Sequence, residues 1–250
     1  MADEYFEKIL VKYNSNLDKT TVEQIRTEIQ NFLSQWAGTT LNEVKISGSY
    51  AKGTNTSLSS DFDIFVSFTS NTQQTNKEIY ELLENKLKEK YSVKRQNVSL
   101  GINASNKKVD VVPGKNQVGN TNDHWLYSTK KDSIFKTNIH KHITLVTNSN
   151  RIKEIKITKI WSKLHNLEFP SIYIELIVLD ALNGCDISKL DLNFQKVLKY
   201  LYENIENSRI VDPANTNNII SEYLTQQEKK IIAQKAKEGC DSQNWGGVVW

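Results

Sequence analysis

The segment KISGSYAKGTNTSLSSDFDIFVSF, residues 45–68, constrains this chain more than any other part of it. A short apolar run ends in Gly48 and Ser49, and about a dozen residues later Asp61 and Asp63 interrupt a second apolar run. Successive side chains of a strand point to opposite faces, so the two aspartates share one face and Phe62, Ile64, Val66 and Phe68 share the other. The two carboxylates are therefore predicted to lie side by side, pointing away from the core.

A third acid, Asp110, alternates with Val109 and Val111 in the run KKVDVVPG. If its strand lies beside the first, three carboxylates come within a few ångströms and repel one another at low dielectric. Divalent cations neutralise such a cluster, and Mg²⁺ prefers carboxylate oxygens together with water and substrate phosphates. Two such ions polarise an attacking hydroxyl and stabilise a leaving pyrophosphate. The pattern predicts a two-ion Mg²⁺ site, with Mn²⁺ as the alternative ion.

The Gly-Ser turn upstream of the aspartates supplies the features of a phosphate site. Gly48 lets the backbone approach a phosphate closely. The hydroxyl of Ser49 and the amides that follow, opening a helix, favour an anion, and Lys52 adds positive charge. Alone, a pair of strand aspartates is usually a solvated edge and a Gly-Ser turn is weaker still. Their combination with a later single aspartate predicts that a triphosphate lies between the turn and the metal ions.

Composition limits the class of protein. The chain has 250 residues, 38% of them hydrophobic and 24% charged, and a net charge of +3, which fits one large or two small globular domains without a nonspecific nucleic-acid coat. Cys185 and Cys240 form no CxxC pair, so a reducing compartment is expected and a zinc ribbon is not. His140 and His142 have no other ligands near them in sequence. With no signal peptide and no apolar stretch long enough for a bilayer, a soluble cytoplasmic protein without a membrane partner is predicted.

The order of elements predicts an α+β fold. The first half is expected to contain helices at 3–13, 20–38 and 75–90, with strands at 43–48, 61–68 and a strand pair within 91–113. Thr21 and Gln24 suggest a capping box for the second helix. This half predicts a mixed sheet with helices on one side. The second half carries helical periodicity at 151–167, 171–183, 191–206 and 225–238. The predicted domains are residues 1–135 and 136–250, with a central cleft between them.

Several motifs together resemble a known superfamily. GSYAKGT, SDFDIFV and VDVVP resemble the polymerase-β-like nucleotidyltransferases. The segment TNIHKHITLVTNSNRIKEIKITKIWSKL is similar to the part that leads into the long spine helix of the oligoadenylate synthetase-like group. FPSIYIELIVLDAL, IVDPANTNNII and AKEGCDSQNWGGVVW are similar to later parts of that group, and most of all to the bacterial cGAS/DncV-like nucleotidyltransferases, or CD-NTases. The resemblance covers nearly the whole chain.

The resemblance implies roles for individual residues. Asp61, Asp63 and Asp110 would be catalytic and bind metal, with Asp110 helping to activate the attacking hydroxyl. Nucleotide binding is implied or suggested for Gly48, Ser49, Lys52, Lys156, Lys159, Ser171 and Asn218.

For some of these residues the sequence itself gives a reason for the nucleotide-binding role, and also a structural alternative to it. Lys156 and Lys159 are three residues apart and face the same side of a helix, where they would neutralise a leaving pyrophosphate or simply form a solvated lysine stripe. Asn218 either contacts nucleotide or fastens its loop. Glu175 lies in an apolar helix, which suggests a buried partner.

The predicted function is Mg²⁺-dependent transfer of a nucleoside monophosphate from a nucleoside triphosphate to a ribose hydroxyl, with release of pyrophosphate. The leading hypothesis is synthesis of a cyclic or linear oligonucleotide signal, as in anti-phage defence, from ATP and other nucleotides. One alternative adds nucleotides to RNA 3′ ends, as CCA-adding enzymes do, although the chain lacks their extra RNA-binding parts. Others are an inactive nucleotide-binding regulatory module and a toxin that modifies protein or tRNA. An RNA acceptor or activator, the bases used and the oligomeric state stay open.

Overall fold

The computed structural model describes residues 2–59, 61–119 and 121–250, and the chain divides by its internal contacts into two compact units. Residues 16–51 and 60–143 make up one, which we call the sheet unit. Residues 1–15, 52–59 and 144–250 make up the other, the helical unit. Each unit is thus assembled from separate pieces of chain, whereas the sequence predicted contiguous domains at 1–135 and 136–250. As functional domains those two ranges stay a prediction.

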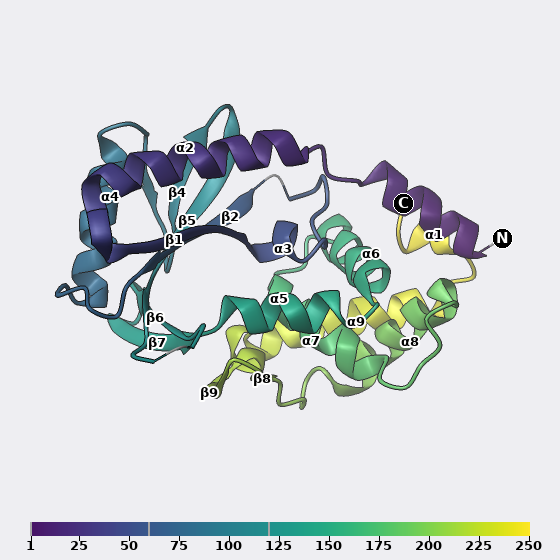
Figure 1. The fold of residues 1–250 in the computed structure, drawn as a ribbon. Helices are drawn as coiled ribbons and strands as arrows, with labels where there is room; N and C mark the ends of the chain where they lie inside the picture. Colours follow the sequence, from purple (N-terminus) through teal and green to yellow (C-terminus); the bar gives the residue numbers. More distant parts are fainter. Residues whose placement is uncertain (1, 60, 120) are drawn as a thin grey trace. The chain divides into compact units, whose positions relative to one another are not determined.

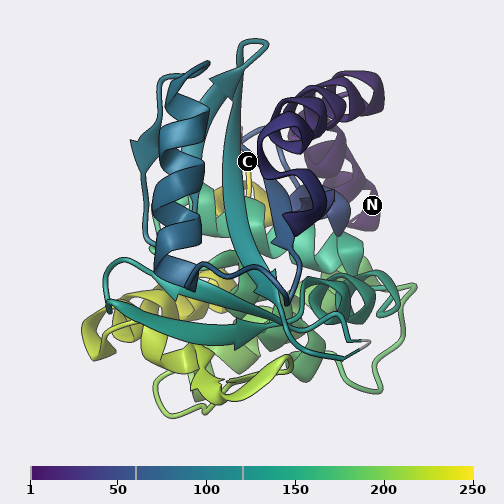
Figure 2. The same cartoon turned by 60° about the vertical axis from the view of Figure 1, so that its left-hand side comes forward.

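The sheet unit contains one mixed sheet (Figures 1 and 2). Its elements in chain order are α2 (Lys19–Ala37), β1 (Leu41–Ser47), α3 (Gly48–Ala51), β2 (Phe62–Phe68), α4 (Asn76–Lys88), β3 (Lys94–Arg95), β4 (Leu100–Ala104), β5 (Lys107–Asn116), β6 (His124–Ser128) and β7 (Ser133–Thr137). The strand order is β1-β2-β5-β4-β3, and β6 joins the end of β5 and pairs with β7. β2 and β5 are parallel and the other described pairs are antiparallel. The predicted mixed sheet is therefore confirmed.

Apolar side chains of α2 and α4 form the core of this unit against one face of the sheet. Figure 1 shows both helices on the same side of β1, β2 and β5. The core contains the following side chains of these two helices and of β2: Val22, Ile25, Ile29, Leu33, Ile79, Tyr80, Leu83, Leu87, Phe62, Ile64, Val66 and Phe68. The alternation predicted for DFDIFVSF therefore holds on its apolar face. The strand itself begins at Phe62, one residue later than expected.

Local signals fix the ends of several elements. α4 begins with a capping box, in which Thr75 and Glu78 each bond to the other's backbone N–H. The capping box predicted at Thr21 is wrong, because α2 begins two residues earlier and Asp18 caps it by accepting from the amide of Thr21 at 2.8 Å. An aspartate carboxylate is also the better partner for a helix N-terminus, since its charge complements the helix dipole.

The β6–β7 hairpin was not predicted from the sequence. It follows a connection after β5 and closes through a turn at Asp132, which has a positive φ of 44° without being glycine. Trp125, which is exposed, and the half-buried Lys136 lie opposite each other on one face of the hairpin. The weak alternation of apolar and polar side chains hides such a hairpin from pattern analysis.

Among its described residues, the helical unit contains four long helices, one N-terminal helix and a small hairpin. These elements are α1 (Ala2–Lys12), α6 (Ile152–Leu164), α7 (Ser171–Ala181), α8 (Leu190–Asn204), β8 (Val211–Asp212), β9 (Asn215–Ile219) and α9 (Gln226–Asp241). α5 (Ile139–Thr147) runs across the division between the two units. The four predicted helices are confirmed within a few residues. No helix in the described part of the chain is both long and apolar enough to cross a membrane.

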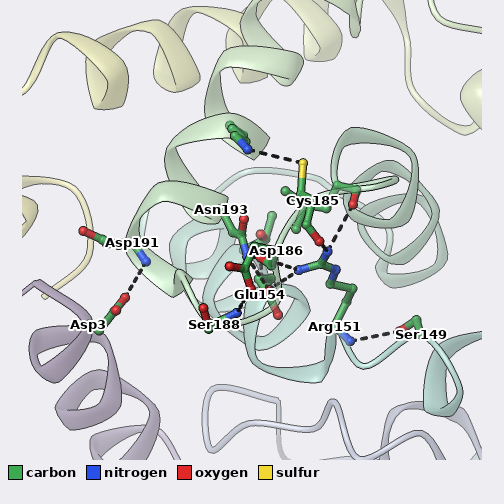
Figure 3. Close-up of polar contacts among 12 residues, drawn as sticks. Asp3, Ser149, Arg151, Glu154, Cys185, Asp186, Ser188, Asp191 and Asn193 are labelled. Atoms are coloured by element: carbon green, nitrogen blue, oxygen red, sulfur yellow. Dashed lines mark hydrogen bonds and ion pairs between the residues drawn. The ribbon is translucent and has the colours of Figure 1, made fainter.

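A buried polar network ties the start of α6 to the end of α7 (Figure 3). Arg151 donates to Glu154 at 3.0 Å and to the backbone carbonyls of Leu182 and Cys185. Asn193 of α8 also donates to Glu154, at 3.0 Å. A guanidinium at the C-terminal end of a helix satisfies carbonyls that have no partner within the helix and complements their partial charge.

Candidate active site

The sheet brings two of the three predicted aspartates into direct register. β2 and β5 pair in parallel with Asp63 opposite Asp110, so both side chains lie on the same face of adjacent strands. On its other side β2 pairs with β1, where Ser47 is opposite Asp63. Asp61 comes immediately before β2, and its charge reaches Asp110. All three carboxylates therefore belong to one end of the β2–β5 pair.

The Gly48 turn packs directly on Asp63. Gly48 opens the one-turn helix α3 with a φ of +61°, in the region that glycine adopts readily. A Cβ at this position would lie 1.6 Å from Oδ2 of Asp63, a distance at which no side chain fits. Only glycine therefore allows the turn to approach the carboxylate this closely. Ser49 is the second residue of α3.

Asp110 is half-buried and held by a glutamine that the sequence did not single out. Gln96 donates from Nε2 to Oδ1 of Asp110 at 2.8 Å. Gly101 is opposite Asp110 on β4, and a Cβ there would lie 2.8 Å from the same amide nitrogen. Burial raises the pKa of Asp110; the hydrogen bond from Gln96 opposes this rise and the charge of Asp61 adds to it. The burial of Asp110 thus favours the uptake of a proton or a cation by its carboxylate.

The carboxylates suit a divalent ion that is shared with substrate. Among residues 2–59, 61–119 and 121–250, no three histidine, cysteine or acidic side chains are close enough together to enclose an ion on their own. Mg²⁺ is typically held by one or two carboxylates with water and substrate phosphates, not by an all-protein cage. Asp63 and Asp110, paired in register, with Asp61 beside them, provide that smaller set of hard oxygen donors.

A second group of predicted residues meets within the helical unit. Lys52 Nζ lies 2.7 Å from Oε2 of Glu175, and Lys159 Nζ lies 2.7 Å from Oε1 of the same carboxylate. Lys159 also donates to Thr54 Oγ1 at 2.8 Å. Burial alone would raise the pKa of Glu175, but the ammonium groups of Lys159 and Lys52 outweigh it and hold that pKa below its usual range. The buried partner expected for Glu175 is confirmed, and it is a pair of lysines.

In the described part of the chain, the remaining predicted residues make no hydrogen bond or ion pair with Glu175. Lys156 is half-buried on α6, and burial lowers its pKa. Within the described ranges its ammonium group has no hydrogen-bond or ion-pair partner. Ser171 is the exposed first residue of α7, one turn before Glu175. Asn218 donates to Asp212 at 3.1 Å and bonds to the hydroxyl of Tyr223, so it fastens the β8–β9 hairpin.

Two residues of the site carried no recognisable signal in the sequence. Gln96 lies in a polar stretch before β4, where nothing marks it as a partner of Asp110. Thr54 lies in the polar segment between the two motifs, and its side chain is fully buried. A threonine in such a segment is normally solvent-exposed, so only the contacts of the folded chain identify it.

Comparisons with known proteins agree with this geometry. A family model described as "Nucleotidyltransferase domain" matches residues 23–116, which include Gly48 and all three aspartates. The cyclic AMP-AMP-AMP synthase of Escherichia coli strain MS 115-1 is 24% identical in an alignment that covers 93% of this chain and 85% of that protein.

Two solved structures share the fold over almost the whole chain. E. coli MS115-1 CdnC, solved with ATP, has a TM-score of 0.80 at 23% identity and covers 96% of this chain and 91% of its own. The Bradyrhizobium diazoefficiens CD-NTase CdnG, in complex with GTP, has a TM-score of 0.77 at 10% identity, with 96% and 92% covered. The chain thus carries a nucleotidyltransferase domain at residues 23–116, and over almost its whole length it has the fold of these CD-NTase structures.

Proposed function

We propose that this enzyme joins nucleotides into a cyclic or linear oligonucleotide in a reaction that depends on Mg²⁺. A ribose hydroxyl oxygen attacks the α-phosphorus of a nucleoside triphosphate. The new oxygen–phosphorus bond forms while the bond to the β-phosphate bridging oxygen breaks, and pyrophosphate leaves with that electron pair. The hydroxyl proton passes to a carboxylate or to water. Positioning and electrostatic stabilisation account for most of the rate of such a transfer.

The pairing of Asp63 with Asp110 under the Gly48 turn is the observation that carries the proposal. Asp61, Asp63 and Asp110 would hold the divalent ions, and such ions would supply Lewis-acid charge at the attacking and leaving oxygens. Asp110 is the acceptor-side carboxylate, because burial raises its pKa and a raised pKa suits a group that receives a proton. The hydrogen bond from Gln96 keeps the carboxylate of Asp110 oriented.

Phosphate recognition is assigned to the turn and to a lysine of α6. Gly48 and Ser49 present backbone amides and a hydroxyl at the start of α3. Lys156 is a half-buried cation that lacks a described partner, and a polyphosphate would supply the missing negative charge. Direct roles for Lys52, Lys159, Ser171 and Asn218 at the nucleotide stay predictions. Lys52 and Lys159 are already engaged by Glu175.

The relatives support the proposed class of product. The E. coli relative is a cyclic AMP-AMP-AMP synthase, and the similarity spans nearly the full length of both chains. This supports an oligonucleotide product made from ATP or other nucleotides. It gives no support to the alternative of nucleotide addition to RNA 3′ ends. The identity of the metal and a role in anti-phage signalling are predictions of the same proposal.

The test is to incubate the purified protein with four labelled nucleoside triphosphates and Mg²⁺, with and without tRNA, and to treat the products with phosphatase. Small phosphatase-resistant products without RNA support the proposal, and label on tRNA alone overturns it in favour of terminal transfer. Asp61→Ala and Asp63→Ala should abolish turnover without loss of fold, since each removes repulsion and leaves no core cavity. Asp132→Ala, at an exposed acid of the same unit, is the control. Metal-independent turnover in EDTA would contradict the mechanism.

A further inference from the structure

The segment Lys52–Ser59, which we call the motif linker, connects the Gly48 turn to Asp61. Its contacts place it in the helical unit, although the chain on either side of it belongs to the sheet unit. Lys52, Thr54 and Thr56 are buried and alternate with more exposed neighbours, so the linker presents one polar edge to the helical unit. Ser57 N donates to the carbonyl of Tyr13 at 2.9 Å, which fixes the far end of the linker to the region after α1.

Glu175 is the centre of the linker's buried contacts. One carboxylate oxygen accepts from Lys52 at 2.7 Å, and the other is contacted by Lys159 at 2.7 Å and by Thr54 at 3.4 Å. Glu175 is 2% exposed. The carboxylate therefore binds the linker directly through Lys52 and Thr54. It also binds the linker indirectly through Lys159, which donates to Thr54.

A negative charge at position 175 is required for this arrangement. Two buried ammonium groups repel each other, and burial of either without a counter-charge is unfavourable. A neutral amide of the same shape keeps one acceptor oxygen, so it cannot accept from both lysines on separate oxygens. The glutamate is thus both the counter-charge and the bridge.

We propose that Glu175 is a positioning residue for the transfer reaction, which acts by holding the motif linker and so fixes the chain on either side of it, namely the Gly48 turn and Asp61. The inference rests on the proposed function. Its physical basis is chain continuity. The Gly48 turn, which is proposed to bind phosphate, lies just before the anchored linker in the chain, and Asp61 lies just after it. A shift of about 1 Å in such groups lowers turnover by about 100-fold.

The chain offers a matched control in Glu154. It is also 2% exposed, lies on a helix of the same unit and pairs with a buried cation, Arg151, at 3.0 Å (Figure 3). None of its described partners belongs to the motif linker. Glu175→Gln and Glu154→Gln therefore remove the same charge from the same kind of environment, and only the first loosens the linker. Thr54→Val is a milder second variant that removes the hydroxyl in contact with Glu175 and Lys159 and conserves the shape of the side chain.

The experiment combines amide hydrogen exchange of the nucleotide-free protein with steady-state kinetics, at a temperature where each variant is folded. For Glu175→Gln we expect faster exchange at residues 48–59 and 61–63, and a kcat lowered by about 10- to 100-fold. The KM for ATP should stay the same or fall, because two ammonium groups lose their counter-charge. Thr54→Val should change in the same direction by less. Glu154→Gln should show wild-type exchange in both segments and wild-type kcat.

Wild-type amide hydrogen exchange of the motif linker in Glu175→Gln overturns the inference. An equal loss of kcat in Glu175→Gln and Glu154→Gln overturns it as well. If Glu175→Gln does not fold, wild-type exchange and kcat in Thr54→Val overturn it instead. If the wild-type protein makes no nucleotide product, the proposed function fails. In that case exchange at residues 48–51 and 61–63 alone decides whether Glu175 holds the linker and the chain beside it.

Discussion

Replacement of Gly48 by alanine tests the geometry of the active site most directly. The new methyl group meets two penalties. The backbone keeps a φ of +61°, a conformation that costs a residue with a side chain about 1–3 kcal/mol. The Cβ would also lie 1.6 Å from Oδ2 and 2.5 Å from Cγ of Asp63, so the carboxylate has to move. Overpacking of this kind typically costs about 1–3 kcal/mol.

The two penalties together predict that Gly48→Ala lowers the free energy of unfolding by about 2–6 kcal/mol. Gly38→Ala is the matched control. Gly38 lies in the same unit with a φ of +53°, and a Cβ there has no neighbour within 4 Å. It should show the backbone penalty alone, about 1–3 kcal/mol, and keep wild-type activity.

The assays are urea unfolding of both variants and turnover with labelled nucleoside triphosphates and Mg²⁺. Because the clash displaces Asp63, Gly48→Ala should lose at least about 100-fold in kcat, well beyond what its lower stability explains. Equal unfolding free energies for the two variants, with wild-type turnover in Gly48→Ala, would refute the packing of the turn on Asp63.

Three further perturbations test the charges that the fold buries. Burial raises the pKa of Asp110 above its ordinary value of 3.8, so the ionised carboxylate destabilises the fold at pH values above 3.8. Asp110→Asn should therefore have a higher Tm than the wild type at pH 7 and the same Tm near pH 3. It should also abolish turnover. Burial lowers the pKa of His124 below its ordinary value of 6.5, so the free energy of unfolding should fall as the pH drops below 6.5. Urea unfolding of His124→Gln should show a free energy that depends less on pH. Arg151→Met leaves Glu154 buried without its partner and should cost about 3–5 kcal/mol in the same assay, with kcat unchanged at temperatures where the variant is folded.

The candidate site was predictable where it depends on local pattern. The alternation in DFDIFVSF placed Asp61 and Asp63 on the face opposite Phe62, Ile64, Val66 and Phe68, and the same rule separated Asp110 from Val109 and Val111. The helix 20–38 was equally clear from its periodicity, but its N-cap was misplaced by three residues. Thr21 and Asp18 both suit a cap, and the sequence does not show which one the chain geometry uses.

The partners of these residues were not predictable, because they come from distant parts of the chain. Gln96 reaches Asp110 only once β3 and β4 have added to the sheet. Lys52 and Glu175 are 123 positions apart in sequence, and Lys159 reaches the same carboxylate from another helix. The β6–β7 hairpin also lacked a strong turn signal, so its existence depended on pairing with the end of β5.

The sequence by itself thus determined the class of fold, the three aspartates and the glycine turn, because each depends on a side-chain period or on a backbone conformation that few residues adopt. Tertiary structure alone decided which charges meet. The sequence suggested that Lys52 and Lys159 bind phosphate, which stays a prediction, and the fold gives both lysines a buried carboxylate as partner. The physical reason is that burial of a charge is unfavourable until a counter-charge is present, and long-range packing determines which counter-charge that is.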